Sequence, residues 1–419
     1  MENTSSPINN KKKIALVLGG TAPHAELIRQ LKERGYYTIL IDYLENPPAK
    51  IEADEHLLES TLDKDTVYSI ALEREVDLVI TTSIDQANIT ACYVLEKLGK
   101  HTPYSYRTAV AVTNKGVMKE DMIKHNIPTS KYLYFGDGEE YVGLENLRLP
   151  VIVKPADSNS AKGVKIAKTF AEAEMYLKEA AEISRTGRAI VEEYVSGIEA
   201  SVYGFVSNHH AKVIMITERL SVIEGENKAI KCYGTLTHIP LSHETRSKIE
   251  KTLDDIAQVY GFDNTPLFMQ IIISDDDISV IEFAPRTGGG MCYQTIATNT
   301  GFNYIGSAID SFIGTPVTLE FTPPKSVYAE TILYATEGVF DHLVGVDELL
   351  SLGEIDGCYL VKTKGTAVTP GSATGERVAF LLLHGETREE IRDRVKMIID
   401  KIDVIDVNGK SILRRDVHL

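Results

Sequence analysis

Residues 267–290 read LFMQIIISDDDISVIEFAPRTGGG, in which two apolar runs flank an acidic turn at residues 275–277. Two apolar runs of strand length around so short a turn predict a β-hairpin. Gln270 and Glu282 fall on its adjacent strands, so we expect their side chains to face each other. Side-chain oxygens placed in this way are suitable ligands for one or two Mg²⁺ ions. The hairpin therefore predicts a metal site.

The hairpin leads into a loop that suits an anionic ligand. Arg286 leaves the second strand just before Gly288, Gly289 and Gly290, and glycines let the backbone approach a ligand closely. A guanidinium at that point can hold phosphate oxygens or a substrate carboxylate. Without other motifs, a structural ion pair explains Glu282 and Arg286 equally well.

Farther upstream, an apolar strand delivers a lysine into a polar turn. Residues 150–164 read PVIVKPADSNSAKGV, so Lys154 ends the strand before a turn that contains Ser158, Ser160 and Gly163. An ammonium group in a desolvated place needs an anion, because an unpaired buried charge is unfavourable. That anion is either a phosphate group or an ordinary carboxylate.

A second acidic segment follows the next strand. Residues 191–199 read VEEYVSGIE. Glu199 can accept hydrogen bonds from ribose hydroxyls, while the strand backbone can meet an adenine edge. Taken alone, these acidic residues are better explained as solvated surface.

The predicted secondary structure around these segments changes from alternating strands and helices to mainly antiparallel strands. A strand at residues 14–20, a helix at 22–34 and a strand at 37–42 open an alternation that continues to residue 98 and predicts a parallel sheet. After residue 113, short strands that are mainly antiparallel dominate, with helices at 171–183 and 243–260. Prolines 323 and 324 indicate a linker, and a strong helix is predicted at 388–401.

The composition excludes several classes of function. The chain has 419 residues and a net charge of −16, so an acidic surface repels nucleic acid and anionic membranes. No apolar run reaches membrane-spanning length, and the polar N-terminal residues do not form a secretory signal. The four cysteines are scattered and do not suggest a zinc site or disulfides. We therefore expect a cytoplasmic protein that acts on small molecules.

In order and spacing, these segments resemble the ATP-grasp superfamily, and especially its ligases similar to L-amino-acid ligases and carbamoyl-phosphate-synthetase-like proteins. The resemblance implies a fold of α/β and α+β type. Its expected parts are a flexible tail (1–10), a Rossmann-like pre-grasp domain (11–108), an ATP-grasp domain (109–325) and a C-terminal α+β lobe (326–419). Residues 371–378 of that lobe resemble a strand-turn unit that completes the wall of the active site, although a purely structural role explains them equally well.

The resemblance also assigns roles to residues. Its cofactors are ATP and Mg²⁺ or Mn²⁺, with Arg286 and Lys154 as catalytic cations and Gln270 and Glu282 as metal ligands. The residues expected to bind the nucleotide are Lys115 and Lys154 at the phosphates, Ser158, Ser160 and Gly163 in the covering loop, Glu192, Glu193, Tyr194 and Val195 in the adenine hinge, and Glu199 at the ribose. Two departures are Gln270, where many members have an acid, and Ala284, where many have an asparagine.

By the same resemblance, the chain joins a carboxylate to an amine through an acyl phosphate and releases ADP. The resemblance implies small carboxylate and amine substrates as partners, and it is also compatible with a homodimer. Carbamoyl-phosphate-synthetase-like or carboxylase chemistry on bicarbonate is one alternative. A nucleotide-binding sensor that has lost catalysis is another, which Gln270 and Ala284 favour.

Overall fold

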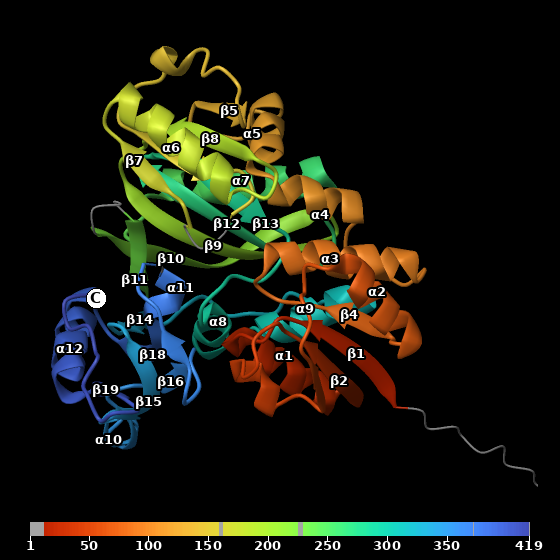
Figure 1. Ribbon diagram of the computed structural model, residues 1–419, viewed down its shortest axis with the longest axis vertical. Coiled ribbons are helices and arrows are strands. Elements are labelled where there is room, and N and C mark those ends of the chain that lie inside the picture. The colour runs from red at the N-terminus through yellow and green to blue at the C-terminus, as the bar shows by residue number, and fades with distance from the viewer. Residues whose placement is uncertain (1–11, 159–161, 225–228, 372, 419) are drawn as a thin grey trace, which may run out of the picture.

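The computed structural model describes residues 12–158, 162–224, 229–371 and 373–418. Within these ranges the strands form four sheets, and Figure 1 shows them arranged in lobes around a common centre. No helix in the same ranges is long and apolar enough to cross a membrane. The domain limits predicted at residues 108 and 325 stay predictions.

The N-terminal lobe has the predicted parallel sheet, with strand order β3-β2-β1-β4. Its central strand β1 is almost fully buried, which explains its continuous apolar run. The strands are β1 (Lys13–Leu18), β2 (Tyr36–Ile41), β3 (Glu55–Leu57) and β4 (Leu78–Ile80). The helices of this region are α1 (Ala22–Glu33), the short η1 (Pro48–Ile51), α2 (Lys64–Glu73), α3 (Asp85–Lys97) and α4 (Tyr106–Thr113).

A small antiparallel lobe follows, with strand order β5-β8-β6-β7. Helix α6 packs Ala173, Leu177 and Ala180 against these strands, in agreement with its helical spacing of apolar residues. The elements are α5 (Lys115–Lys124), β5 (Tyr132–Gly136), η2 (Leu144–Asn146), β6 (Val151–Pro155), β7 (Lys165–Ala167), α6 (Phe170–Ile183) and β8 (Arg188–Glu193).

The largest sheet in the described residues has eight strands in the order β13-β12-β9-β10-β11-β14-β18-β16. The predicted hairpin forms one edge of this sheet, and Gln270 pairs with Glu282 in its register, as expected. Strand β11 was not predicted; it pairs with β14, so the sheet continues past the prolines at 323 and 324. The strands are β9 (Ile198–Ser207), β10 (His210–Glu224), β11 (Ala229–Thr237), β12 (Thr265–Ser274), β13 (Asp277–Ala284), β14 (Val327–Tyr334), β16 (Gly357–Leu360) and β18 (Arg377–Gly385).

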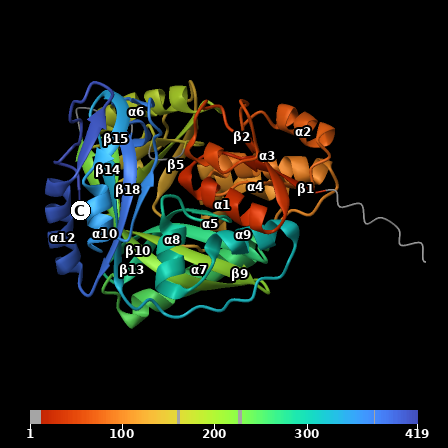
Figure 2. The ribbon, with the colours of Figure 1, turned by 90° about the horizontal axis from the view of Figure 1, so that it is seen from below.

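The remaining elements cover this sheet and complete the C-terminal lobe. Seen from below, the C-terminal lobe and the parallel-sheet lobe lie on opposite sides of the molecule (Figure 2). A small sheet with order β17-β15-β19 lies in the C-terminal lobe. The elements are α7 (His243–Tyr260), α8 (Cys292–Thr300), α9 (Tyr304–Ile313), β15 (Gly338–Val344), α10 (Val346–Ser351), β17 (Ala367–Val368), α11 (Ala373–Glu376), α12 (Arg388–Lys401) and β19 (Asp403–Asp406).

Candidate active site

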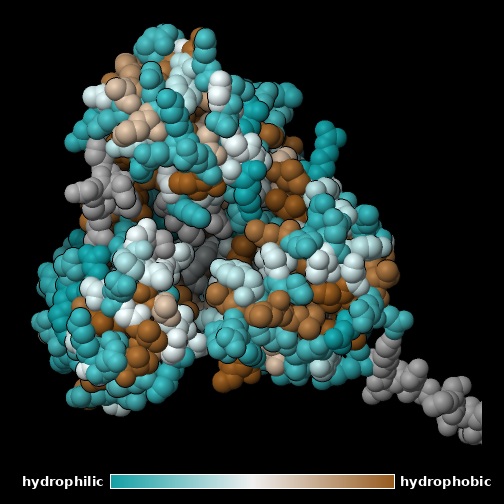
Figure 3. All heavy atoms as spheres, in the orientation of Figure 1, coloured by the Kyte–Doolittle hydropathy of each residue, from teal (hydrophilic) through white to brown (hydrophobic). Residues whose placement is uncertain are grey.

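A cavity of about 620 Å³ lies where the lobes meet, and Figure 3 shows the surface hollowed there. Its walls come from the small lobe, the large sheet, the loop after β13 and the C-terminal lobe. Cavities of this size suit small-molecule ligands and cofactors. This cavity is therefore the place to look for the predicted site residues.

A buried ion network forms the wall of this cavity in the small lobe. Lys154, at the end of β6, forms an ion pair with Glu192 on β8. Lys119 on α5 contacts the other oxygen of Glu192 at 2.8 Å and donates to the hydroxyls of Thr129 (2.6 Å) and Ser130 (2.9 Å). The anion partner of Lys154 in this structure is thus a carboxylate, which is one of the two partners that the sequence allowed.

Burial and the two lysines shift the pKa of the Glu192 carboxyl in opposite directions. Burial alone would raise the pKa of the Glu192 carboxyl, but Lys119 and Lys154 lower that pKa to about 2. The group is therefore ionised at neutral pH. Because a buried carboxylate needs compensation by cations, each lysine contributes to the stability of this lobe.

Lys119→Met is expected to lower the free energy of unfolding by about 3 kcal/mol, because breaking a buried ion pair leaves a charge poorly compensated. The effect falls at the low end of the usual range because Lys154 remains beside Glu192. Urea denaturation measures it, and Lys124→Met, an exposed change on the same helix, is the control. Equal stability of both variants would show that Lys119 adds nothing to the network.

Lys115 connects the small lobe to the hairpin. It is the first residue of α5, a helix whose N-terminus is capped by Asn114 through hydrogen bonds from Gly116 and Val117. The Nζ atom of Lys115 donates to the carbonyl oxygen of Ser158 at 2.6 Å and lies 3.6 Å from Glu282 Oε2. Its ammonium group therefore lies between the polar turn and the predicted metal ligand.

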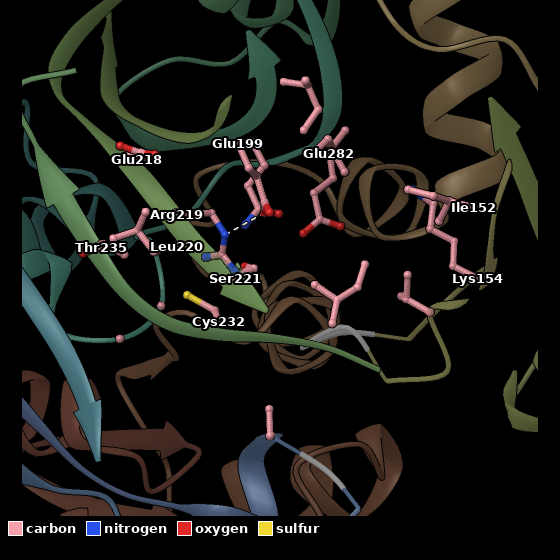
Figure 4. A pocket seen from close by; sticks show the side chains of 18 of the residues that line it. Ile152, Lys154, Glu199, Glu218, Arg219, Leu220, Ser221, Cys232, Thr235 and Glu282 are labelled. Carbon is pink, nitrogen blue, oxygen red and sulfur yellow. Dashed lines mark hydrogen bonds and ion pairs between the residues drawn. The ribbon is translucent and has the colours of Figure 1, made fainter. Parts of the chain in front are cut away.

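A chain of polar contacts crosses the large sheet on the cavity side. With the amide nitrogen of Gln270 turned toward the hairpin partner, it donates to Glu282 Oε1 at 2.9 Å. The amide oxygen then accepts from Arg219 Nε at 3.2 Å, and Arg219 Nε also donates to Glu199 Oε1 at 2.8 Å. Figure 4 shows the Arg219 pair with Glu199 and the carboxylate of Glu282 in the same cavity.

The residues at the hairpin fit a Mg²⁺ ion that is shared with a substrate. Among the described residues, no group of three or more His, Cys, Asp or Glu side chains is placed to hold a metal by itself. Mg²⁺ in nucleotide sites usually takes one or two carboxylates and completes its shell with waters and phosphates. Glu282 offers one carboxylate, and Gln270 would add its amide oxygen by turning it from Arg219 toward the metal, which matches that donor set with one charge fewer.

Arg286 is held by the parallel-sheet lobe. Its Nε and Nη2 atoms donate to the two oxygens of Asp85 at 2.6 and 2.8 Å, and Nη1 donates to the carbonyl oxygen of Thr287 at 2.8 Å. Burial would lower the pKa of Arg286, but Asp85 raises it, so the guanidinium stays charged. Arg286 thus forms an ion pair with Asp85, and Glu282 forms one with Lys115, so the alternative of structural ion pairs that the sequence left open stays open.

The cavity gathers most of the predicted residues. Those that line it are Lys115, Lys154, Ser158, Glu192, Glu193, Tyr194, Val195, Glu199, Gln270, Glu282 and Arg286. Gly163 does not line it; its φ is +75°, and a side chain there would bring its Cβ within 2.9 Å of Pro155 Cγ, which explains why glycine occupies the position. Ser160 lies outside the described residues.

Sequence reasoning missed several charged residues at or beside this cavity. Lys119 follows Lys115 by four residues, which places both on one face of a helix, and this spacing was a usable signal. Asp85 and Arg219 carried no such signal, because their partners depend on contacts between distant segments. Glu330 also lines the cavity and belongs to the same class, whereas Arg377 lies in the segment 371–378 that the resemblance placed at the wall of the active site.

Two parts of the chain match family models. Residues 113–292 match the ATP-grasp (A) domain of phosphoribosylglycinamide synthetase, and residues 331–406 match the C-terminal domain 2 of L-amino acid ligase. A formate-dependent phosphoribosylglycinamide formyltransferase of Sulfurisphaera tokodaii is 24% identical over 93% of this chain and 97% of the relative.

Solved structures are similar over nearly the whole chain. An L-amino acid ligase from Bacillus licheniformis aligns with a TM-score of 0.75 and 16% identity, covering 94% of this chain and 99% of that one. The biotin carboxylase domain of 2-oxoglutarate carboxylase from Hydrogenobacter thermophilus, solved with MgADP and bicarbonate, gives a TM-score of 0.76 and 16% identity, covering 96% and 91%.

The chain therefore has the ATP-grasp fold. Its similarity to ATP-grasp enzymes, with an L-amino acid ligase among them, confirms the resemblance that the motifs indicated. The matching family model is that of an ATP-grasp domain, and similar structures were solved with MgADP and with ATP, the cofactors that the resemblance implies. The roles of individual side chains remain proposals.

Proposed function

We propose that the chain is an ADP-forming ligase that phosphorylates a carboxylate with ATP and joins the resulting acyl phosphate to an amine. The observation that carries this proposal is the convergence of Lys115, Lys154 and Arg286 with Glu282 on one cavity. Phosphoryl transfer depends mainly on positioning and on neutralising charge at the phosphate oxygens. The cavity supplies these cations, and the proposed transfer needs no side-chain nucleophile.

Each of these three cations is balanced by a carboxylate of the protein. Lys154 contacts Glu192, Lys115 lies near Glu282, and Arg286 contacts Asp85. The phosphates of ATP can replace Glu192 and Glu282 as the partners of the two lysines, since phosphate oxygens are strong acceptors for ammonium groups. Mg²⁺ bound by Gln270 and Glu282 would neutralise charge on the same phosphates.

The remaining nucleotide contacts follow from the cavity wall. The segment from Glu192 to Val195 lines the cavity beside Lys154 and would meet the adenine edge. Glu199 uses one oxygen for Arg219, which leaves its other oxygen for a ribose hydroxyl. Arg286, held by Asp85, would steady the oxygens of the carboxylate that receives the phosphoryl group.

The relatives suggest which carboxylates to test first. The name of the Sulfurisphaera relative specifies formate, and the carboxylase structure contains bicarbonate. An L-amino acid ligase adds amino acids to the set. Formate, bicarbonate and the common amino acids therefore form the starting panel of carboxylates.

With the right carboxylate present, the protein is expected to release ADP and not AMP, because the cations surround the site of the terminal phosphate. Hydroxylamine should trap the activated acyl group as a hydroxamate. Chromatographic separation of nucleotides and a ferric hydroxamate assay measure the two products, and omission of the carboxylate is the control. AMP and pyrophosphate would refute the mechanism, whereas ADP release independent of any carboxylate would favour the nucleotide-binding sensor.

A further inference from the structure

A second group of charged residues lines the cavity and has no role in the nucleotide site described above. Glu330 lies on β14, and Arg377 is the first residue of β18. Both strands belong to the C-terminal half of the large sheet, away from β6 and β8. Any ligand of these two residues would therefore lie on the C-terminal-lobe side of the cavity.

Arg377 has no carboxylate at ion-pair distance among the described residues, although it acts electrostatically on Glu330 from farther away. Its buried Nε atom has no hydrogen-bond partner in the described part of the chain. Its Nη2 atom makes one long contact of 3.4 Å with the hydroxyl of Tyr334. The guanidinium carbon lies 5.2 Å from the ring centre of Phe380, which attracts the cation but does not neutralise it. Such a group is suited to bind an anion.

Glu330 is a buried carboxylate that has no cation in contact with it among the described residues. Its side chain is only 5% exposed, and its two oxygens accept from Met291 N–H at 3.1 Å and from Thr295 Oγ1 at 3.3 Å. Both donors are neutral, and no lysine or arginine of the described residues lies at ion-pair distance from it, although Arg377 and Arg219 act on its charge from farther away. Two contacts use about half of the acceptor sites of a carboxylate. Both donors lie at the start of helix α8. The other acceptor sites of the Glu330 carboxylate are therefore left for a ligand in the cavity.

We propose that Glu330 and Arg377 form the subsite for the amine substrate, and that this amine also carries an anionic group. The ammonium end would lie on Glu330 and the anionic end on Arg377. This inference rests on the proposed ligase function, since only the second half of that reaction needs an amine. The anion can be a carboxylate, as in an amino acid, or a phosphate, as in a phosphorylated amine.

The subsite predicts a pH dependence of amine binding. Burial raises the pKa of the Glu330 carboxyl to about 7, although Met291, Thr295 and Arg377 act to lower it. Since only the ionised carboxylate attracts an ammonium group, the KM for the amine should fall as the pH rises from 6 to 8. The other charged or titratable groups near Glu330 are Arg219, Tyr203, Cys292 and Tyr359.

The test compares coupling of an anionic amine with trapping by hydroxylamine, which has no anionic group. The variants are Glu330→Gln, which keeps an acceptor for Met291 N–H, and Arg377→Gln. The exposed changes Glu337→Gln and Arg107→Gln are the matched controls. The amines are glycine, glycine methyl ester and O-phosphoethanolamine, each with Mg-ATP and the carboxylate that gives the strongest hydroxamate signal.

For each active-site variant, the ratio of amine-coupled product to hydroxamate is expected to fall at least about ten-fold, because removing one partner of a buried charge contact costs a few kcal/mol. The controls should keep the wild-type ratio. A preference for glycine over its ester identifies a carboxylate at Arg377, and a preference for O-phosphoethanolamine identifies a phosphate. In Glu330→Gln, the change of KM between pH 6 and 8 should disappear.

Equal coupling of glycine methyl ester, glycine and O-phosphoethanolamine, or unchanged ratios in both variants, would overturn the subsite while leaving the ligase function in place. If wild-type protein forms no hydroxamate with any carboxylate, the ligase function fails instead. Calorimetric binding of glycine and O-phosphoethanolamine then tests the subsite without turnover. Binding of either amine that weakens in both variants would support the subsite, and binding that is absent or unchanged would overturn it.

Discussion

Lys154→Met is expected to lower kcat by a factor of about 100 to 1,000, because it removes a preorganised cation from the developing charge of the transferring phosphoryl group. Methionine is similar in length, so the change in packing at the end of β6 is small. In the structure Lys154 contacts Glu192, which keeps Lys119 as a second partner after the substitution. Steady-state ADP release at saturating ATP measures the effect.

Two further measurements make this result specific to the phosphate site. Lys168→Met, an exposed lysine in the same lobe, should turn over like the wild type. Thermal unfolding should show that the Lys154 variant is still folded at the assay temperature. If the folded variant kept its kcat and its KM for ATP, Lys154 would be only the structural partner of Glu192.

Glu282→Ala is expected to reduce Mg²⁺-dependent turnover at least about a hundred-fold, because loss of roughly 3 kcal/mol of charge stabilisation corresponds to that factor in rate. Glu282 is the one carboxylate of the hairpin pair, since Gln270 supplies a neutral oxygen. Its removal therefore leaves the metal without a charged protein ligand. Titration of ADP release against Mg²⁺ concentration measures both the maximal rate and the metal requirement.

The same variant should leave the fold intact. The side chain of Glu282 is 32% exposed, so its truncation opens no sealed cavity in the core. Glu250→Ala, an exposed change on α7, provides the control for stability and turnover. Undiminished turnover of Glu282→Ala would contradict the metal assignment, and global unfolding would indicate a structural role through its contact with Lys115.

Local patterns predicted the parts of the fold that depend on neighbouring residues. The hairpin of β12 and β13 was predicted with its facing pair because a tight turn fixes the register of two adjacent strands. The parallel sheet followed from alternating strands and helices in the first hundred residues. The resemblance to a known superfamily then supplied the order of nucleotide contacts, which composition and spacing alone left ambiguous.

Contacts between distant segments could not be predicted in this way. Arg286 contacts Asp85, which lies 201 residues away, and the sequence near either residue does not identify the other. Strand β11 pairs with its neighbour β10 and also with β14, and the second pairing spans a stretch that includes three helices and a hairpin, so the sequence did not indicate it. The resemblance placed the segment of Arg377 at the wall of the active site, but that Glu330 lines the same cavity became visible only in three dimensions.

The pairing of β11 with β14 has a consequence for dividing this chain into fragments. A cut near residue 325 would strip β14 from β11, where Leu236 is fully buried at present. Each fragment would then carry an unpaired strand edge, and exposed edges promote association between chains. The two edges are complementary in hydrogen bonding and in apolar surface. Separately made fragments should consequently associate on mixing through the pairing of β11 with β14.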